Sequence, residues 1–300
     1  MRVLVTGATG FVGSRLIAEF AQQGCQVRAL ARSPRSAEGL RRDGYEPRIG
    51  DLLDERSIRG AGEDVDVAYY LVHAMAAGGD FERREAQAAS NFARMAAADR
   101  VDRVVYLGGL GGEAASPHLR SRHHTAEILQ AAGPPLTYFR AAMVVGAESE
   151  SYRTLRYLVQ RLPVMIAPAW LQTDTQPIGI DDVVAYLSRA PLVQESRGRE
   201  VQIGGPDVLS YGDMLDRMAL ALGKRPRAKL PVPVLSPRLS SLWLGLVTPV
   251  DTKVARPLVE GLVTETVVTD PSGAEPFGID PAPFDEALHR AIAQADADGA

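Results

Sequence analysis

The chain has 300 residues, enough for one large α/β domain or two small ones. Hydrophobic residues make up 46% of it, which supports a sizeable core, and the formal net charge of −4 gives no basic footprint for nucleic acid. The single cysteine, Cys25, excludes an internal disulfide and a cysteine-rich metal site. Because no signal peptide is visible, we expect a cytoplasmic protein.

Strand-like and helix-like patterns alternate through about residue 146. Expected strands cover residues 2–7, 26–32, 46–52, 65–72, 101–110 and 135–146. Expected helices follow the first strand and cover residues 33–44, 80–99 and 122–133. This rhythm predicts a doubly wound parallel sheet with right-handed crossovers, an α/β Rossmann fold.

The rhythm breaks after residue 149. We expect helices over residues 151–163, 211–222 and 284–295, and strands near residues 177 and 200. The predicted organisation is an NAD(P)-binding Rossmann core over 1–148 and a small C-terminal substrate cap over 149–300, with residues 177–204 returning to the core.

The most apolar late stretch, residues 230–250, is interrupted by Pro231, Pro233, Pro237 and Arg238. The part after Arg238, residues 239–250, is shorter than the roughly 20 residues that a spanning helix needs. We therefore expect no membrane span here, but a helix that packs on the core or lines an apolar pocket.

Three glycines, Gly7, Gly10 and Gly13, follow the first expected strand in VTGATGFVG and precede an amphipathic helix. In such a unit the first glycine permits a tight turn, the second lets the backbone approach a pyrophosphate, and the third lets helix pack on strand. The free N–H groups of the helix N-terminus then face the phosphates. The alternative is a turn with no ligand, but the strand–helix context favours nucleotide binding.

The strand over residues 26–32 ends in ALARSPR, with Arg32 where the fold reads the ribose and Ser33 beside it. Folds that prefer NAD place an acid there, whereas an arginine accommodates a 2′-phosphate. We therefore expect NADP, with NAD as the less favoured cofactor. The alternative is a solvated Arg32 in a chain that uses arginine far more than lysine.

The spacing in TGATGFVG resembles the extended short-chain dehydrogenase/reductase superfamily, and the motifs IGDLLD, YYLVHAM, LRSRHHTAEIL and QPIGIDDVVAYL resemble its atypical NmrA-like NAD(P)H-binding branch. The resemblance implies that Asp51 binds the adenine amino group and that Leu52 lies against the ring. It implies a loop over the nicotinamide at residues 140–143. The full set of implied cofactor-binding residues is Gly7, Thr9, Gly10, Phe11, Val12, Gly13, Arg32, Ser33, Asp51, Leu52, Leu71, Val72, His73, Gly108, Arg122, Arg140, Ala141, Ala142 and Met143.

Reductases that the chain resembles use a Ser, a Tyr and a Lys. Here His118 stands where the Tyr is expected, Arg122 where the Lys is expected, and Gly108 or Gly109 replaces the Ser. An imidazole could donate a proton near neutral pH, and Arg122 could still bind the ribose. Candidate catalytic residues are His118, Arg122 and His73, against the alternative that His118 is a surface histidine. We expect no metal site.

The sequence supports two functions. The first is an NADPH-dependent oxidoreductase that reduces a hydrophobic small molecule, with a substrate pocket formed by residues 149–161, 170–176 and the region around Trp243. The second is a non-enzymatic NAD(P)-binding redox sensor or structural subunit, which the missing Ser, Tyr and Lys favour. A sugar-nucleotide epimerase or dehydratase is a weaker option. The protein is expected to be a monomer or a homodimer.

Overall fold

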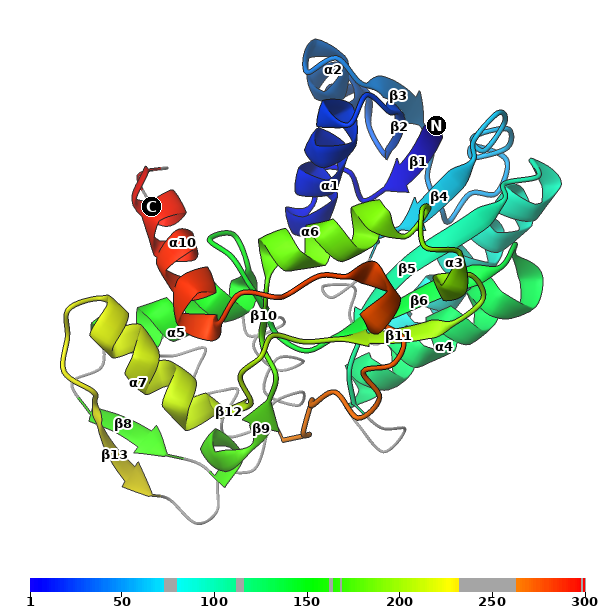
Figure 1. The fold of residues 1–300 in the computed structure, drawn as a ribbon. Coiled ribbons are helices and arrows are strands. Elements are labelled where there is room, and N and C mark those ends of the chain that lie inside the picture. The colour runs from blue at the N-terminus through cyan, green and yellow to red at the C-terminus, as the bar shows by residue number, and fades with distance from the viewer. Residues whose placement is uncertain are drawn as a thin grey trace.

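The computed structural model describes residues 1–72, 80–111, 116–161, 164–167, 169–231, 263–297 and 299. Seven parallel strands form the central sheet in the order β11-β6-β5-β4-β1-β2-β3 (Figure 1). This confirms the predicted doubly wound sheet. The strands are β1 (Arg2–Thr6), β2 (Gln26–Ala31), β3 (Glu46–Ile49), β4 (Val67–Tyr70), β5 (Arg103–Gly109), β6 (Leu136–Ala141) and β11 (Glu200–Ile203).

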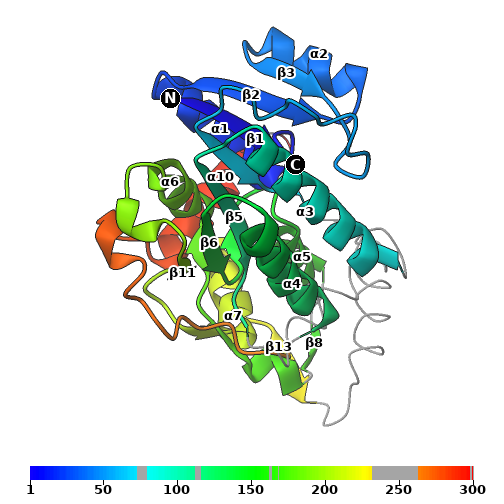
Figure 2. The same ribbon diagram turned by 90° about the vertical axis from the view of Figure 1, so that its right-hand side faces the viewer.

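Helices cover both faces of the sheet. On one face α1 (Phe11–Gln22) packs against α6 (Ile180–Arg189), and on the other α3 (Phe81–Ala98) packs against α4 (Pro117–Ala132) (Figure 2). Each face encloses its own cluster of buried apolar side chains. Strands covered on both sides are nearly continuously apolar, as β4 and β5 are.

Side-chain caps set where two of the helices begin. The Ser33 side chain accepts a hydrogen bond from Ser36 N and starts α2 (Pro34–Arg42) at a proline, as its sequence predicts. The Ser116 side chain accepts from Leu119 N in the same way, so α4 begins five residues before the expected start at residue 122. His118 and Arg122 therefore lie one turn apart on the same helix.

A third buried apolar cluster lies beyond the sheet. It is formed mainly by α5 (Glu150–Arg161), α7 (Tyr211–Ala221) and α10 (Phe284–Ala297), with the short helix η2 (Ala169–Gln172) (Figure 1). Three small sheets accompany it, in which β7 (Val144–Val145) pairs with β10 (Ile178–Gly179), β9 (Asp174–Thr175) with β12 (Leu209–Ser210), and β8 (Val164–Ala167) with β13 (Ala228–Pro231). The division into core and cap at residue 148 stays a prediction.

Candidate functional site

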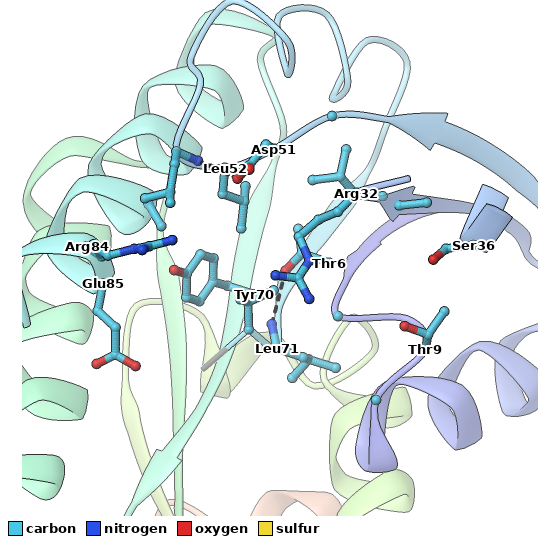
Figure 3. A pocket seen from close by; sticks show the side chains of 18 residues that line it. Thr6, Thr9, Arg32, Ser36, Asp51, Leu52, Tyr70, Leu71, Arg84 and Glu85 are labelled. Carbon is cyan, nitrogen blue, oxygen red and sulfur yellow. Dashed lines mark hydrogen bonds between the residues drawn. The ribbon is translucent and has the colours of Figure 1, made fainter. Parts of the chain in front are cut away.

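A cavity of about 330 Å³ opens at the carboxyl ends of β1, β2 and β4, where the strand order reverses (Figure 3). Open α/β sheets bind their ligands at this switch point. The cavity is lined by Thr6, Gly7, Thr9, Gly10, Leu30, Ala31, Arg32, Ser36, Gly50, Asp51, Leu52, Leu53, Tyr70, Leu71, Val72, Arg84, Glu85 and Ala88.

The glycine turn leaves no room for side chains. Gly7 has φ +69°, and a Cβ there would lie 2.5 Å from the Leu71 carbonyl oxygen. A Cβ at Gly13 would collide with the Gly7 carbonyl oxygen. Gly10 N donates to that same oxygen over 2.9 Å and closes the turn. The backbone therefore forms a tight turn, called the glycine cradle below, that only glycine can occupy at positions 7 and 13.

The cradle leads directly into α1. Its N-cap residue, Gly10, provides no side-chain hydrogen bond to the first turn. The first-turn N–H groups of a helix have no partner within the helix, and they carry its positive dipole end. These features fit the pyrophosphate of a dinucleotide, whose negative charge would be held there by backbone N–H groups.

Thr6 fixes the wall beside the cradle. Its buried hydroxyl donates to the Tyr69 carbonyl oxygen over 3.0 Å and accepts from Leu71 N over 3.1 Å. These two bonds hold the end of β4 against β1, so the position of Leu71 in the cavity wall is set by a β1 side chain. Thr6 was not among the predicted site residues, and its polar side chain at the end of an otherwise apolar strand was the available signal.

Arg32 and its neighbours occupy the end of β2. The Arg32 side chain is exposed and points into the cavity (Figure 3). Ser36 also lines the cavity, and its hydroxyl lies 2.9 Å from the hydroxyl of Ser33. Ser33 caps α2 and does not line the cavity. The structure thus brings Arg32 together with Ser36, where the sequence pointed to Ser33.

The loop after β3 closes the far end. Asp51 Oδ1 accepts from Leu53 N over 3.0 Å, and Asp51 N donates to the Ser57 hydroxyl over 2.9 Å. Leu52 is buried below this turn. Asp51 and Leu52 therefore both line the cavity, at the end opposite the glycine cradle.

The wall facing the sheet comes from α3. Glu85 is only 5% exposed, and its carboxylate accepts a hydrogen bond from the Ser121 hydroxyl of α4. Tyr70, in the cavity floor, packs edge-on against Tyr106 at 5.8 Å. Tyr106 in turn donates from its hydroxyl to the Arg122 carbonyl oxygen over 3.2 Å. The turn of α4 that carries Arg122 is thereby joined to two residues of the cavity.

Packing explains why glycines end β5. A Cβ at Gly108 would lie 2.8 Å from the Tyr138 hydroxyl oxygen, and a Cβ at Gly109 would lie 2.6 Å from Cδ2 of Leu119. The Tyr138 hydroxyl is buried and has no hydrogen-bond partner within the described ranges, and burial raises its pKa to about 12. A serine at either glycine would require these neighbours to move.

His118 and Arg122 form a pair close to these glycines. Arg122 Nε donates to His118 Nε2 over 3.1 Å, so the neutral imidazole carries its proton on Nδ1. Burial, together with the charge of Arg122, lowers the pKa of His118 to about 3. The imidazole is neutral at neutral pH, which differs from the readily protonated donor that the sequence suggested.

The nicotinamide-loop residues expected from the sequence lie at the end of β6. The Arg140 guanidinium donates to the carbonyl oxygens of Gly109 and Gly111 and pairs with Glu200 at 2.8 Å. It ties β5, β6 and β11 together. Of the predicted cofactor residues that the structure describes, those outside the cavity lining are Phe11, Val12, Gly13, Ser33, Gly108, Arg122, Arg140, Ala141, Ala142 and Met143. The cofactor roles of the whole predicted set, inside the lining and outside it, stay predictions.

Some predictions fall on segments that the structure does not describe. His73 and Trp243 lie outside the described residues. In the described ranges, no cluster of three or more His, Cys, Asp or Glu residues could hold a metal ion, and no helix is long and apolar enough to cross a membrane.

Known proteins are similar to this chain in sequence and in fold. A family model described as NAD(P)H-binding matches residues 7–157. The chain is 28% identical over 242 residues to an Arabidopsis thaliana mitochondrial protein, NADH dehydrogenase [ubiquinone] 1 alpha subcomplex subunit 9, covering 77% of this chain. It is 27% identical over 271 residues to a chloroplastic divinyl chlorophyllide a 8-vinyl-reductase from Oryza sativa subsp. indica, covering 81% of this chain. The matches span 60% and 63% of those two relatives, less than two thirds of either.

A solved structure extends the likeness in fold to nearly the whole chain. The Citrobacter sp. triphenylmethane reductase complexed with NADP(H) superposes with a TM-score of 0.77 at 15% identity, over 97% of this chain and 100% of that one. The match of the family model to half of the chain, on the glycine cradle and the switch-point cavity, decides the family. The chain belongs to the NAD(P)H-binding family, and its central sheet has the Rossmann-type order of such proteins.

Proposed function

We propose that the protein is an NADPH-dependent oxidoreductase that acts on a hydrophobic small molecule without the usual Ser, Tyr and Lys. The preference for NADPH over NADH rests on Arg32, whose guanidinium faces the cavity at the end of β2. Residues 26–36 contain no carboxylate that could bind a ribose 2′-hydroxyl. A planar guanidinium matches a phosphate, so this end of the cavity favours the 2′-phosphorylated cofactor.

Each part of the cavity has a role in holding the cofactor. The cradle at Gly7 and Gly10 and the N-terminus of α1 would hold the pyrophosphate, Arg32 the 2′-phosphate, and Asp51 and Leu52 the adenine. When bound, a reduced nicotinamide supplies a hydride to an electrophilic carbon. These residues position the cofactor and take no part in proton transfer.

His118 would act as a hydrogen-bond donor through Nδ1. Its Nε2 is occupied by Arg122, and its lowered pKa keeps the ring neutral. A neutral imidazole can polarise a substrate oxygen, as in other enzymes that keep a histidine uncharged. The proton that completes the reduction then comes from water. The cationic Arg122 holds the imidazole in the required tautomer.

The substrate class rests on the apolar character of the C-terminal residues. Tyr152 and Leu155 of α5 and Trp170 of η2 come from the stretches predicted to form the substrate pocket, and they are buried in one apolar cluster. The names of two similar proteins, a chlorophyllide reductase and a triphenylmethane reductase, are consistent with large hydrophobic substrates. A cytoplasmic location remains part of this proposal.

A second candidate is a redox sensor or structural subunit that binds NAD(P)H without turnover. The glycines at the end of β5 favour it, because neighbouring side chains fill the space of the expected serine. The similarity to a subunit of NADH dehydrogenase is consistent with it. An anaerobic panel of quinones, enones and aldehydes with NADPH separates the two. Substrate-dependent loss of nicotinamide absorbance supports the reductase, and none across the panel supports the sensor.

Cofactor preference has its own test. Replacing Arg32 with Ala is expected to weaken NADPH binding by roughly 10- to 100-fold and NADH binding little, since a charge-assisted bond is lost only with the former. Isothermal titration calorimetry measures both affinities. Arg41→Ala is the matched control, because Arg41 is an exposed arginine of α2 that pairs with Glu38 and does not line the cavity. Equal losses for the two cofactors would refute the preference.

A further inference from the structure

A second arginine reaches the same cavity from the opposite wall. Arg84, on the first turn of α3, lines the cavity, and its guanidinium points toward Leu52 and Tyr70 (Figure 3). Arg32 faces it from the end of β2. The proposed function gives a role to Arg32 and none to Arg84.

Arg84 differs from the other arginines of α3. Arg83 pairs with Asp80 at 2.8 Å, and Arg94 pairs with Glu55 at 3.0 Å. Arg84 makes no hydrogen bond or ion pair with another residue in the described ranges, although its own helix places Glu85 in the same cavity wall. The Arg84 guanidinium is exposed and is not paired with a carboxylate in the described ranges. Such a planar group can stack on a flat, aromatic part of a ligand.

The position of Arg84 identifies which part of a dinucleotide it would meet. The cavity runs from the glycine cradle, past Arg32 and Ser36, to the loop that carries Leu52. If the cradle holds the pyrophosphate and Arg32 the ribose phosphate, the base lies at the far end. That end is bounded by Leu52, by Tyr70 and by Arg84 with Ala88, one turn further along α3.

We propose that the Arg84 guanidinium stacks on the adenine ring and so contributes to the affinity for the adenosine half of either cofactor. The inference rests on the proposed function only in requiring a dinucleotide in this cavity. Guanidinium groups stack on π systems, and Leu52 provides an apolar surface for the base within the same cavity. This contact does not involve the 2′-phosphate. Arg84 would therefore recognise the base, which both cofactors have, and Arg32 the phosphate, which only NADPH has.

The test compares three probes by calorimetry on the full chain: NADPH, NADH and reduced nicotinamide mononucleotide, which has no adenosine. Arg84→Ala is expected to weaken NADPH and NADH binding by the same factor, about 3- to 10-fold, and to leave the mononucleotide unchanged. Arg83→Ala is the matched control, since Arg83 is the adjacent arginine of α3 and lies outside the cavity lining. Arg84→Tyr keeps a stacking surface without a charge and should recover part of the loss.

Several outcomes would overturn the inference. One is an Arg84→Ala variant with wild-type affinity for both dinucleotides. Another is a loss confined to NADPH, which would make Arg84 a phosphate ligand. In a different outcome, Arg32→Ala lowers the affinities for NADPH and NADH equally while Arg84→Ala weakens the binding of both. That result would refute the proposed NADP preference and support the adenine contact. A wild-type protein that binds neither dinucleotide would overturn both proposals. Thermal unfolding of each variant confirms that it is folded.

Discussion

Two regions of the molecule are built on different principles. One is the switch-point cavity, where we propose that the adenosine half of the cofactor binds (the adenosine side), and the other is the end of β5, where we propose that the reaction takes place (the reacting side). The adenosine side is a cavity shaped by backbone. Its form is set by the glycine turn, by the hydrogen bond from the Thr6 hydroxyl to the Tyr69 carbonyl oxygen and by the turn at Asp51. The reacting side is a packed junction in which Tyr138, Leu119 and Arg140 occupy the space around the end of β5. The difference teaches that the shape of the adenosine side is set by backbone that excludes side chains, whereas the form of the reacting side is set by the side chains that fill it.

Gly13→Ala should break the adenosine side most severely. The new methyl group would collide with the Gly7 carbonyl oxygen, so the cradle must open. Overpacking of this kind costs about 1 to 3 kcal/mol in unfolding free energy. We also expect NADPH affinity to fall more than 10-fold, because the phosphate cradle is displaced. Urea unfolding and calorimetry measure the two effects. The control is Gly39→Ala in α2, where a Cβ meets no atom within 4 Å.

Ser121→Ala tests the bond that joins the two sides. It removes the hydroxyl that donates a hydrogen bond to the buried Glu85 carboxylate. The expected loss is about 1 to 3 kcal/mol of unfolding free energy. Since Ser121 lies outside the cavity lining, NADPH affinity should change less than it does in Gly13→Ala. A fully stable Ser121→Ala protein would show that this hydrogen bond does not stabilise the packing of α3 on α4.

The low pKa of His118 predicts how stability depends on pH. Between pH 6.5 and about 3 the unfolded chain binds a proton at His118 that the folded protein does not. This group therefore makes stability fall as pH falls, by at most about 1.4 kcal/mol per pH unit. His118→Gln should flatten the curve of unfolding free energy over this range, relative to wild type. An unchanged slope would mean that the imidazole titrates normally.

Ser33→Ala separates a structural serine from a cofactor ligand, and has the smallest expected effect. Loss of the cap of α2 should cost about 1 kcal/mol in thermal or urea unfolding. NADPH affinity should change little, because Ser33 lies outside the cavity lining and Ser36 lies within it. A large, selective loss of NADPH binding would return Ser33 to the cofactor site and assign it to the 2′-phosphate.

Local sequence signals predicted the fold and the cradle well. Strand and helix periodicity, the cap at Ser33 and the glycine spacing are local patterns, and the parallel sheet follows from their alternation. The α3 wall of the cavity was missed because Arg84 and Glu85 look like ordinary polar positions of a surface helix. Only the docking of α3 beside β4 brings them to the nucleotide cavity, and no short-range pattern reports that contact.

His118 shows the same limit for chemistry. The sequence places it where a tyrosine is expected, but its protonation depends on burial and on the Arg122 bond. Both arise from where α4 begins and how it packs on β5. A residue type can therefore suggest a proton donor while the fold makes it a neutral hydrogen-bonding group.

The late arrival of Phe277 has a consequence for biosynthesis. Its buried ring packs against Phe139 at 5.5 Å and Tyr186 at 5.4 Å, while every residue that lines the nucleotide cavity precedes residue 89. A ribosome completes the cavity residues first and supplies β11 and Phe277 on the order of ten seconds later. Until then the β6 edge lacks its β11 partner, and the rings of Phe139 and Tyr186 lack their contact with Phe277. The nascent chain is thus expected to need protection from aggregation, and early nucleotide binding could supply only part of it.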